Sequence, residues 1–405
     1  MAGGERLRIL QVIPYFTPNM GGDVNFCYNI SKGLAERNDV TILTTDYEID
    51  REYSRSLNNN GVRVIPLHCT ANIGFYLVSP SAGTWIRDNI SNFDVVHMHT
   101  FRSYQNPLVH RYSIEQGVPY VIQAHGSVLR RCGKTILKWG FDSVYGHRLL
   151  RDADAYIAIT EKESEQYAAM GASRERIRIV TSGIEDLEPQ CAALAGSFRR
   201  KYGIRDNDRL ILYVGRLHKS KGVDMLFDAF CEVTRGLKNS KLAFVGPDYG
   251  QRSKLEKMIR SCRLNENVVF TGFVSRDEKI AAYADADVFV TPSYYGFPQT
   301  FLEACACGTP IITTKEGDGL DWIDDGVGCV VDYDSHKLAE AIIGLLEDSA
   351  TSDRYSVEGR RLAREEFNWN RVVDKIEEVY MGVIRRRKTE QPDGIAQADP
   401  LASGG

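Results

Sequence analysis

The stretch Thr291–Pro310, TPSYYGFPQTFLEACACGTP, carries the clearest structural pattern in this 405-residue chain. The apolar run Val288–Thr291 leads into it as a predicted strand, and a turn rich in glycine and proline follows. A short helical pattern, Thr300–Ala306, then ends at Gly308, and the next apolar run is Pro310–Thr313. A strand, a helix and a second strand in close succession predict a βαβ unit with parallel strands.

The same alternation extends along nearly the whole chain, with a pause at the charged, strand-free residues 185–209. The other predicted strands are Arg8–Ile13, Val40–Thr44, Val62–Pro66, Val95–His97, Tyr120–Ala124, Ala155–Ile159, Ile177–Val180, Leu210–Val214, Lys241–Val245, Val268–Phe270 and Gly328–Val331. The other predicted helices are Asp23–Arg37, Ser81–Ile90, Pro107–Gln116, Ile136–Leu150, Glu161–Met170, Val223–Arg235, Gln251–Cys262, Asp277–Tyr283, Ser335–Leu346 and Trp369–Arg387. This pattern predicts an α/β protein of two Rossmann-like, doubly wound domains in tandem.

We place the domain boundaries where this pattern changes. Residues 1–190 form the predicted first Rossmann-like domain, and residues 191–368 form the second. Residues 369–388 form a final helix, and residues 389–405, which lack large apolar side chains, form a disordered tail.

Composition narrows the class of protein and of partner. The net charge of −4 provides no general attraction to nucleic acid, so an anionic partner must meet a local patch. The nine cysteines show neither zinc-site nor redox spacing. We find no signal peptide and no apolar stretch of about 18 residues that would span a membrane. These features predict a protein of the reducing cytoplasm, with no metal site and no cofactor.

Two glycine-bounded loops follow predicted strands, at the sheet edge where open α/β proteins bind ligands. Gly21 and Gly22 precede the first helix, whose N-terminus favours an anion. Arg216 and Lys221 lie between two glycines at the start of the second domain, where a guanidinium and an ammonium suit a diphosphate. The alternative interpretations are a tight turn for the first loop and a solvated basic loop for the second.

Two further residues with functional side chains follow strands. His125 comes directly after Tyr120–Ala124, next to a glycine, so it is predicted to face a cleft. Glu303 lies on the short helix after Val288–Thr291, where a carboxylate can accept hydrogen bonds from paired ribose hydroxyls. The alternatives are a structural histidine and a glutamate that complements the helix dipole.

Taken together, these motifs resemble those of the family-4 glycosyltransferases, which have the GT-B fold. The resemblance extends in order and spacing from about residue 8 to 385. It rests on Gly21-Gly22, His125-Gly126, Gly215-Arg216, Lys221-Gly222, Phe270–Phe273, Pro292-Ser293, Leu302–Ala304, Cys307-Gly308 and Pro310. It implies two facing domains and a final helix that crosses back to the first one.

The resemblance also implies roles for individual residues. Gly22 would place its backbone N–H against the donor phosphate, with Gly21 beside it. Arg216 and Lys221 would neutralise the leaving diphosphate in place of a metal, and His125 would contact the transferred sugar. Glu303 would hold the ribose. The remaining donor-binding residues would be Phe273 and Val274, over the base, and Tyr295, Gly296, Phe297, Phe301 and Leu302.

One residue departs from the family pattern. Eight positions before Glu303 the family usually carries a glutamate that binds the donor sugar, and this chain has Tyr295. A phenol donates and accepts a hydrogen bond but is neutral at pH 7. Glycoside hydrolysis uses paired carboxylates that flank the bond, and no such pair is evident in this sequence. We therefore expect front-face transfer with retention, in which the departing phosphate takes the acceptor proton while Arg216 and Lys221 stabilise its charge.

The segment Val128–Leu150, directly after His125, is the candidate surface for the acceptor. Its basic residues are Arg130, Arg131, Lys134, Lys138 and Arg148, against the single acid Asp142. Its aromatic and aliphatic residues would suit an anionic membrane surface or a lipid-linked acceptor at the inner membrane face. The alternative is an amphipathic helix packed on its own domain.

The sequence therefore predicts a glycosyltransferase with a nucleotide-sugar donor, UDP- or GDP-linked, and a glycan or lipid-linked acceptor. A nucleotide-sugar-binding protein with weakened or lost catalysis remains an alternative because of Tyr295. A nucleotide-sugar epimerase of the same fold is another. A dinucleotide oxidoreductase is a third, although neither glycine-rich turn has its G-x-G-x-x-G pattern.

Overall fold

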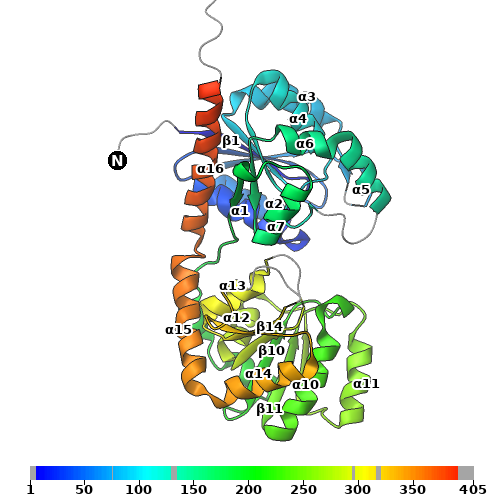
Figure 1. Ribbon diagram of the computed structural model, residues 1–405, viewed down its shortest axis with the longest axis vertical. Helices are drawn as coiled ribbons and strands as arrows, with labels where there is room; N and C mark the ends of the chain where they lie inside the picture. Colours follow the sequence, from blue (N-terminus) through cyan, green and yellow to red (C-terminus); the bar gives the residue numbers. More distant parts are fainter. Residues whose placement is uncertain (1–5, 75, 129–134, 294–296, 316–320, 391–405) are drawn as a thin grey trace, which may run out of the picture. The chain divides into compact units, whose positions relative to one another are not determined.

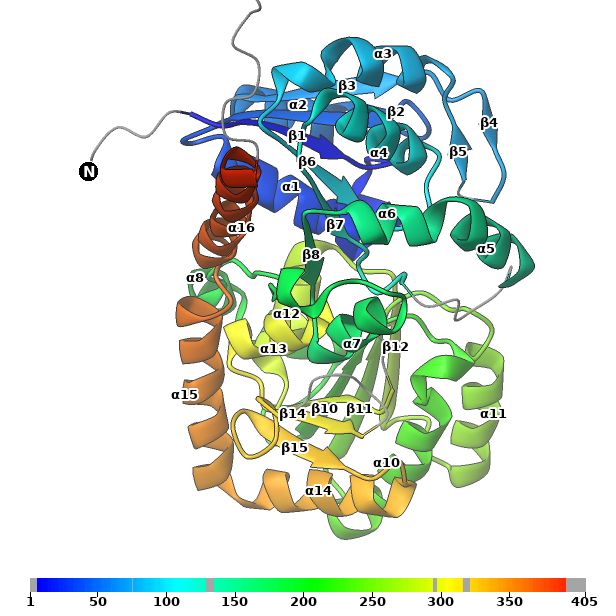
Figure 2. The same ribbon diagram turned by 45° about the horizontal axis from the view of Figure 1, so that its top comes forward.

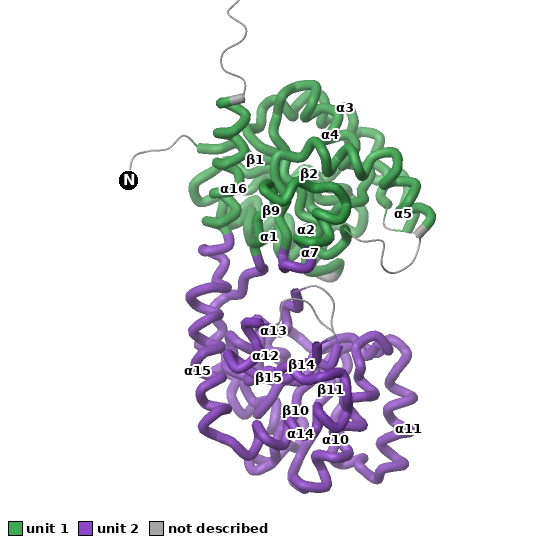
Figure 3. The backbone as a smooth tube through the Cα atoms, in the orientation of Figure 1, with its two compact units in different colours: residues 1–158, 164–180, 373–405 green, residues 159–163, 181–372 purple. Residues whose placement is uncertain are grey.

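The computed structural model describes residues 6–74, 76–128, 135–293, 297–315 and 321–390. The chain forms two compact units (Figures 1 and 3). The first unit comprises residues 1–158, 164–180 and 373–405, and the second comprises residues 159–163 and 181–372. The main division thus falls at residue 180, where the sequence placed it at 190, and the chain returns to the first unit at residue 373.

The first unit is built on a parallel sheet with strand order β3-β2-β1-β6-β7-β8-β9. The strands are β1 Arg8–Val12, β2 Asp39–Thr45, β3 Val62–Leu67, β6 Val95–His99, β7 Tyr120–Gln123, β8 Ala155–Ala158 and β9 Ile177–Ile179. The order reverses between β1 and β6, and such a switch point is where open α/β sheets bind ligands. The predicted doubly wound sheet is confirmed for this unit.

Helices connect the parallel strands of the first unit. They are α1 Gly22–Leu34, α2 Arg51–Asn59, α3 Ser81–Asn89, α4 Gln105–Gln116, α5 Thr135–Phe141, α6 His147–Asp152 and α7 Glu161–Ala169, with 3-10 turns η1 Pro18–Met20, η2 Ile90–Asn92 and η4 Arg174–Arg176 and a π-helical turn η3 Asp142–Gly146. The sequence had predicted no helix at α2. A small antiparallel hairpin, β4 Ala71–Asn72 and β5 Leu77–Val78, stands apart from the main sheet (Figure 2).

The second unit repeats the architecture with strand order β12-β11-β10-β13-β14-β15, again all parallel. The strands are β10 Arg209–Val214, β11 Ser240–Val245, β12 Val268–Gly272, β13 Val288–Thr291, β14 Ile311–Thr314 and β15 Gly328–Val331. Its helices are α8 Glu188–Leu194, α9 Ser197–Tyr202, α10 Val223–Gly236, α11 Arg252–Cys262, α12 Arg276–Asp285, α13 Gln299–Cys307, α14 Ser335–Glu347 and α15 Ser349–Glu365, with the 3-10 turn η5 Lys219–Lys221. The switch point lies between β10 and β13.

Apolar side chains cover both faces of this second sheet. Along β10, Leu210 and Leu212 belong to one buried cluster, whereas Ile211 and Tyr213 belong to another. Successive side chains of a strand point to opposite faces, so a strand buried on both sides is an uninterrupted apolar run. This explains why the run Leu210–Val214 was recognisable in the sequence.

The last helix, α16 Trp369–Glu390, continues the chain from α15 and packs on the first unit from residue 373 onward. A Cβ atom on Gly33 of α1 would lie 2.6 Å from Cγ2 of Val373, so only glycine allows this close approach. Near its other end, the Arg387 Nε donates to Asp154 Oδ1 at 2.6 Å. The predicted return of the final helix to the first domain is confirmed.

Candidate functional site

The glycine loop of the first unit connects β1 to α1. Gly21 has a φ of 157°, and a Cβ atom there would lie 2.6 Å from Asp23 Oδ1, so the turn itself requires glycine. A Cβ atom on Gly22 would meet nothing within 4 Å. Gly22 therefore leaves open space at the first residue of α1, where an anion would find the helix N-terminus.

His125 follows β7 and adopts a φ of 51°, in the left-handed region that few non-glycine residues enter. The Phe26 ring on α1 lies edge-on to its imidazole, with centroids 5.3 Å apart. Burial lowers the pKa of His125 to about 4, although the nearby Asp23 carboxylate opposes this shift. His125 is therefore a neutral imidazole at pH 7.

A buried chain of hydrogen bonds runs from His125 across the sheet to α16. Its Nε2 lies 3.0 Å from Nδ1 of His99, and Nε2 of His99 lies 2.8 Å from Oε1 of Gln11. The Gln11 Nε2 donates to the Tyr380 hydroxyl at 3.0 Å, which lies 2.7 Å from Nδ1 of His97. We call these five side chains the histidine relay.

This arrangement determines which nitrogen of His125 carries the proton. Gln11 Oε1 can only accept, so His99 must donate from Nε2. Burial and the neighbouring histidines hold the pKa of His99 well below its usual range, so the ring is neutral and its Nδ1 is an acceptor. His125 then donates from Nε2, which leaves its Nδ1 free of a proton and able to accept a hydrogen bond.

In the second unit, the loop after β10 brings two cations together. Gly222 has a φ of 65°, and a Cβ atom there would lie 2.9 Å from Cβ of Pro292, so glycine is required before α10. The Arg216 guanidinium is exposed and lies 5.3 Å from the centre of the Tyr249 ring. Burial and the positive charge of Arg216 lower the pKa of Lys221. Two like charges at a strand end favour binding of an anion.

Glu303 lies on α13, and its carboxylate has two different surroundings. Its Oε1 accepts from Lys279 Nζ of α12 at 2.6 Å. Its Oε2 is buried without a hydrogen-bond partner in the part of the chain that the structure describes. A buried acceptor without a partner is costly, so this oxygen is suited to receive a ligand hydroxyl.

The other predicted donor-binding residues differ in exposure. Phe273, after β12, has 81% of its surface exposed, whereas Val274 is partly buried against the core. Phe297 stacks on Trp322, with centroids 5.9 Å apart. Tyr295 and Gly296 lie outside the described residues.

Phe301 and Leu302 differ from the other predicted donor-binding residues, and their assignment to the donor site stays a prediction. Both side chains are buried in the core of the second unit, so neither side chain faces a ligand. The Phe301 backbone N–H also donates to the Pro298 carbonyl at 3.1 Å. The family resemblance had placed both among the donor-binding residues, and their buried side chains anchor α13, which carries Glu303.

The predicted acceptor patch lies partly within the described residues. Arg130, Arg131 and Lys134 lie outside them, and Lys138 is half-buried on α5. Asp142, the acid counted against these cations, is fully buried and bound by both Nε and Nη2 of Arg102 at 2.8 Å. Its charge is therefore neutralised inside the unit and does not reduce the basic character of the surface.

The apolar side chains of α5 face outward. Ile136 is 84% exposed, Leu137 65% and Trp139 59%. Such large side chains are normally buried, and a group of them beside basic residues is typical of a binding surface. Among the described residues, no helix is both long and apolar enough to cross a bilayer.

The other members of the histidine relay and Lys279 are not among the residues that the sequence predicted. The signal for the histidines was present in His97-Met98-His99, because residues two apart on a strand point to the same face. Gln11 and Tyr380 gave no signal, since each becomes a partner only through the tertiary fold.

Two family models match the chain. The model described as Glycosyltransferase Family 4 matches residues 20–186, and the model described as Glycosyl transferases group 1 matches residues 196–362. An uncharacterised glycosyltransferase of Methanocaldococcus jannaschii is 24% identical over 390 residues, covering 92% of this chain and 98% of its own. The GDP-mannose-dependent alpha-(1-6)-phosphatidylinositol monomannoside mannosyltransferase of Mycolicibacterium smegmatis is 24% identical, covering 95% and 100%.

Among solved structures, the Anabaena protein HepE in complex with UDP-glucose superposes with a TM-score of 0.72 at 19% identity, covering 93% of this chain and 100% of its own. The fold is GT-B, and the chain is an enzyme, a glycosyltransferase. The resemblance to the family-4 glycosyltransferases that its motifs had indicated is confirmed by the match of the Family 4 model to residues 20–186.

Proposed function

We propose that this enzyme is a retaining, metal-independent hexosyltransferase with a nucleoside diphosphate sugar as donor. The observation that carries the proposal is the charge arrangement at the strand ends of the second unit. Arg216 and Lys221 gather positive charge, and Glu303 offers a buried carboxylate oxygen that forms no hydrogen bond with any described residue. Two cations suit a diphosphate, and a carboxylate suits the ribose hydroxyls.

The chemistry follows from these groups. The bond from the sugar C1 to the diphosphate oxygen breaks, and Arg216 and Lys221 stabilise the charge that develops on that oxygen. The acceptor hydroxyl attacks the same face of C1 and transfers its proton to the departing phosphate. His125, neutral and with Nδ1 as an acceptor, would take a hydrogen bond from a hydroxyl of the transferred sugar.

The relatives suggest the type of donor. The mannosyltransferase is named for GDP-mannose, and HepE was solved with UDP-glucose. We therefore propose a UDP- or GDP-linked hexose. Binding of both classes should be compared by thermal shift, and the anomeric configuration of the product should be read by NMR. A product of inverted anomeric configuration would refute the mechanism. So would a loss of activity in excess EDTA that is restored when a divalent metal is added.

We further propose that α5 and the residues before it attach the enzyme to the inner face of the cytoplasmic membrane, near a lipid-linked or glycan acceptor. The outward Ile136, Leu137 and Trp139 support this, because a helix packed on its own domain would turn them inward. Replacing both Leu137 and Trp139 by serine should abolish co-sedimentation with anionic vesicles at low salt. Unchanged co-sedimentation would exclude this surface as the attachment site.

A further inference from the structure

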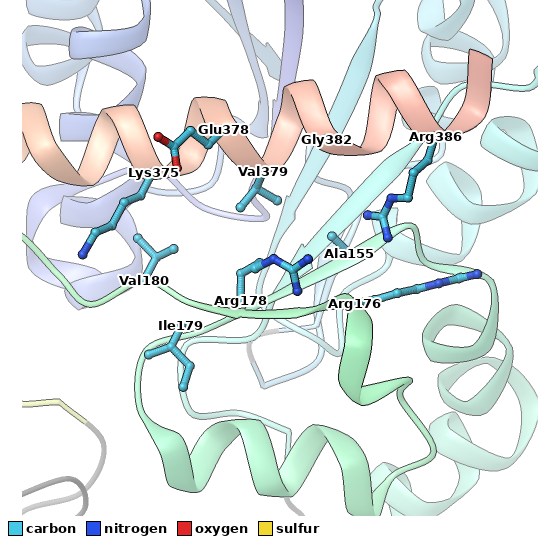
Figure 4. Close-up of a pocket in the computed structure, with 10 residues that line it drawn as sticks. All are labelled: Ala155, Arg176, Arg178, Ile179, Val180, Lys375, Glu378, Val379, Gly382 and Arg386. Atoms are coloured by element: carbon cyan, nitrogen blue, oxygen red, sulfur yellow. The ribbon is translucent and has the colours of Figure 1, made fainter. Parts of the chain in front are cut away.

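A cavity of about 480 Å³ lies in the first unit between α16 and the last strands of its sheet (Figure 4). Its lining residues are Ala155, Arg176, Arg178, Ile179, Val180, Lys375, Glu378, Val379, Gly382 and Arg386. None of them belongs to the proposed donor site. We call this space the helix-16 cavity.

Backbone carbonyl groups hold the three guanidinium groups of the helix-16 cavity in place. Arg176 donates to the Ala153 carbonyl at 2.9 Å. Arg178 donates to the Glu175 carbonyl at 2.7 Å through a single nitrogen, Nη1, which also contacts the Ile177 carbonyl. Since each guanidinium has five N–H donors, most of them remain available to a ligand.

The third guanidinium comes from the opposite wall. Arg386 extends from α16 toward the strand side, where Arg176 and Arg178 lie (Figure 4), and donates to the Asp154 carbonyl at 3.1 Å. The carboxylate of Asp154 is already bound to Arg387, so it does not neutralise Arg386.

The cavity holds a large excess of positive charge. Arg176, Arg178, Lys375 and Arg386 form no ion pair with any described residue, and Glu378 is the single carboxylate in the lining. Four cations against one carboxylate leave a net charge of +3. Cations that line one cavity repel one another, so this arrangement favours a multiply charged anion.

A second cavity under the same helix shows that this excess is not a general property of α16. It has a volume of about 370 Å³, and its lining also includes several cations. There, however, Arg8 pairs with Asp94 at 2.8 Å, and Arg387 pairs with Asp154 at 2.6 Å. Arg6 also pairs with Asp39, at 3.6 Å. Three of the four cations that line the second cavity are therefore paired with carboxylates of described residues, whereas none of the four cations of the helix-16 cavity is.

We propose that the helix-16 cavity binds a ligand bearing a phosphate monoester or a diphosphate. Guanidinium forks match the oxygens of phosphate, and pockets of roughly 300–1,000 Å³ accommodate small organic ligands. The apolar side chains Ile179, Val180 and Val379 would contact the organic part of the ligand, and Glu378 would accept a hydrogen bond from one of its hydroxyl groups. This site is separate from the donor site and is independent of the proposed reaction.

Inorganic pyrophosphate is the probe, and calorimetry on the full chain is the measurement. The Arg216→Ala background silences the proposed donor site. In that background we expect pyrophosphate to bind, and Arg178→Gln with Arg386→Gln to weaken it at least about tenfold. Lys375→Gln, which removes no hydrogen bond that holds the fold, should weaken it less. Arg385→Gln, an exposed position on the same helix outside the lining, should have no effect.

Three results would overturn the proposal: no binding in the Arg216→Ala background, equal weakening by Arg385→Gln, or unchanged binding in the folded double variant and in Lys375→Gln. Vesicles identify the source of the phosphate. The ligand is a lipid headgroup if two results are obtained. The enzyme should bind phosphatidylcholine vesicles only when they contain phosphatidic acid, and this binding should be lost in the double variant but retained when Leu137 and Trp139 are replaced by serine. If only pyrophosphate binding is lost, it is a free phosphate compound.

Discussion

The two units share one topology, yet their strand ends carry different chemistry. In the first unit, the ends of β6 and β7 hold neutral histidines linked by hydrogen bonds. In the second unit, the loop after β10 and the helix α13 hold two cations and a carboxylate. The strand order determines where a site forms, and the side chains determine what it binds.

Under the proposed function, the two sets of side chains have different roles. The charged groups of the second unit would hold the nucleoside diphosphate. The neutral acceptor nitrogen of the first unit would meet the uncharged hydroxyls of the sugar. Substitutions in the second unit should therefore affect nucleotide affinity, whereas substitutions in the first should affect transfer with little change in that affinity.

The largest effect is expected from Arg216→Ala. Loss of one charged stabiliser of the developing diphosphate typically costs about 2.7–4 kcal/mol, or 10²–10³ in rate. The dissociation constant of the nucleoside diphosphate should rise as well. Steady-state kinetics and calorimetry check both. Arg209→Ala is the matched control, because Arg209 begins the same strand at its opposite end and pairs with Asp287. If the folded Arg216→Ala variant binds the nucleotide with unchanged affinity, Arg216 does not belong to the donor site.

Glu303→Gln should have the next largest effect. Hydrogen bonds to a charged group contribute about 1.5–3 kcal/mol, so the affinity for a nucleoside diphosphate should fall roughly tenfold to a hundredfold. The affinity for inorganic pyrophosphate, which has no ribose, should remain the same in this variant when it is measured in the Arg178→Gln and Arg386→Gln background, where the helix-16 cavity does not contribute. Lys279→Met provides the control for the lost ion pair at Oε1. An equal loss for both ligands would show that Glu303 acts on the diphosphate and not on the ribose.

The comparison also shows how far sequence reasoning reaches. The parallel sheets were predictable because strands buried on both faces are continuous apolar runs. The helix α15 was not, because its buried stripe includes Tyr355, Gly359 and Ala363, of which two are too small to give an apolar periodicity. Its N-cap, Asp348, whose side chain accepts from Thr351 N at 3.1 Å, was the readable signal.

Sequence reasoning was weaker for the candidate site than for the fold. The predicted topology was enough to identify three candidate residues, because each lies at a strand end or on the helix that follows: Arg216, Lys221 and Glu303. The surroundings of those groups were not readable, because Lys279 reaches Glu303 from a different helix. Phe301 and Leu302 belong to the same motif but serve the core, since a motif records both packing and ligand contact.

Acid should destabilise the first unit more than the second. Burial holds the pKa of His97 and of His99 well below the usual value and that of His125 at about 4. The unfolded chain then binds more protons than the folded one below about pH 6.5. Stability is full above that pH and falls toward pH 4, with a slope of about 1.4 kcal/mol per pH unit for each such group.

Hydrogen exchange by mass spectrometry at pH 6.5 and pH 5, corrected for intrinsic rates, measures this effect for each unit. Exchange in β1, β6 and β7 should accelerate relative to β10 and β11. Both histidines of the second unit, His218 and His336, are exposed, whereas His97 and His99 are fully buried. Equal acceleration in both units would show that the three buried histidines do not dominate the acid response.

The smallest effect is expected from Tyr380→Phe, at the far end of the histidine relay. The substitution keeps the ring of Tyr380 against His97 but removes the oxygen that accepts from Gln11. Gln11 is then free to turn its amide, and His99 loses the fixed acceptor that sets its tautomer. Transfer should slow by an amount typical of one neutral hydrogen bond, about 0.5–1.5 kcal/mol, while nucleotide affinity stays constant. Nitrogen NMR of the His125 ring supplies the decisive readout, because the native enzyme should show an unprotonated Nδ1 and the variant a mixture of tautomers. A native enzyme with its proton on Nδ1 would reverse the direction of the relay and make His125 a donor to the sugar.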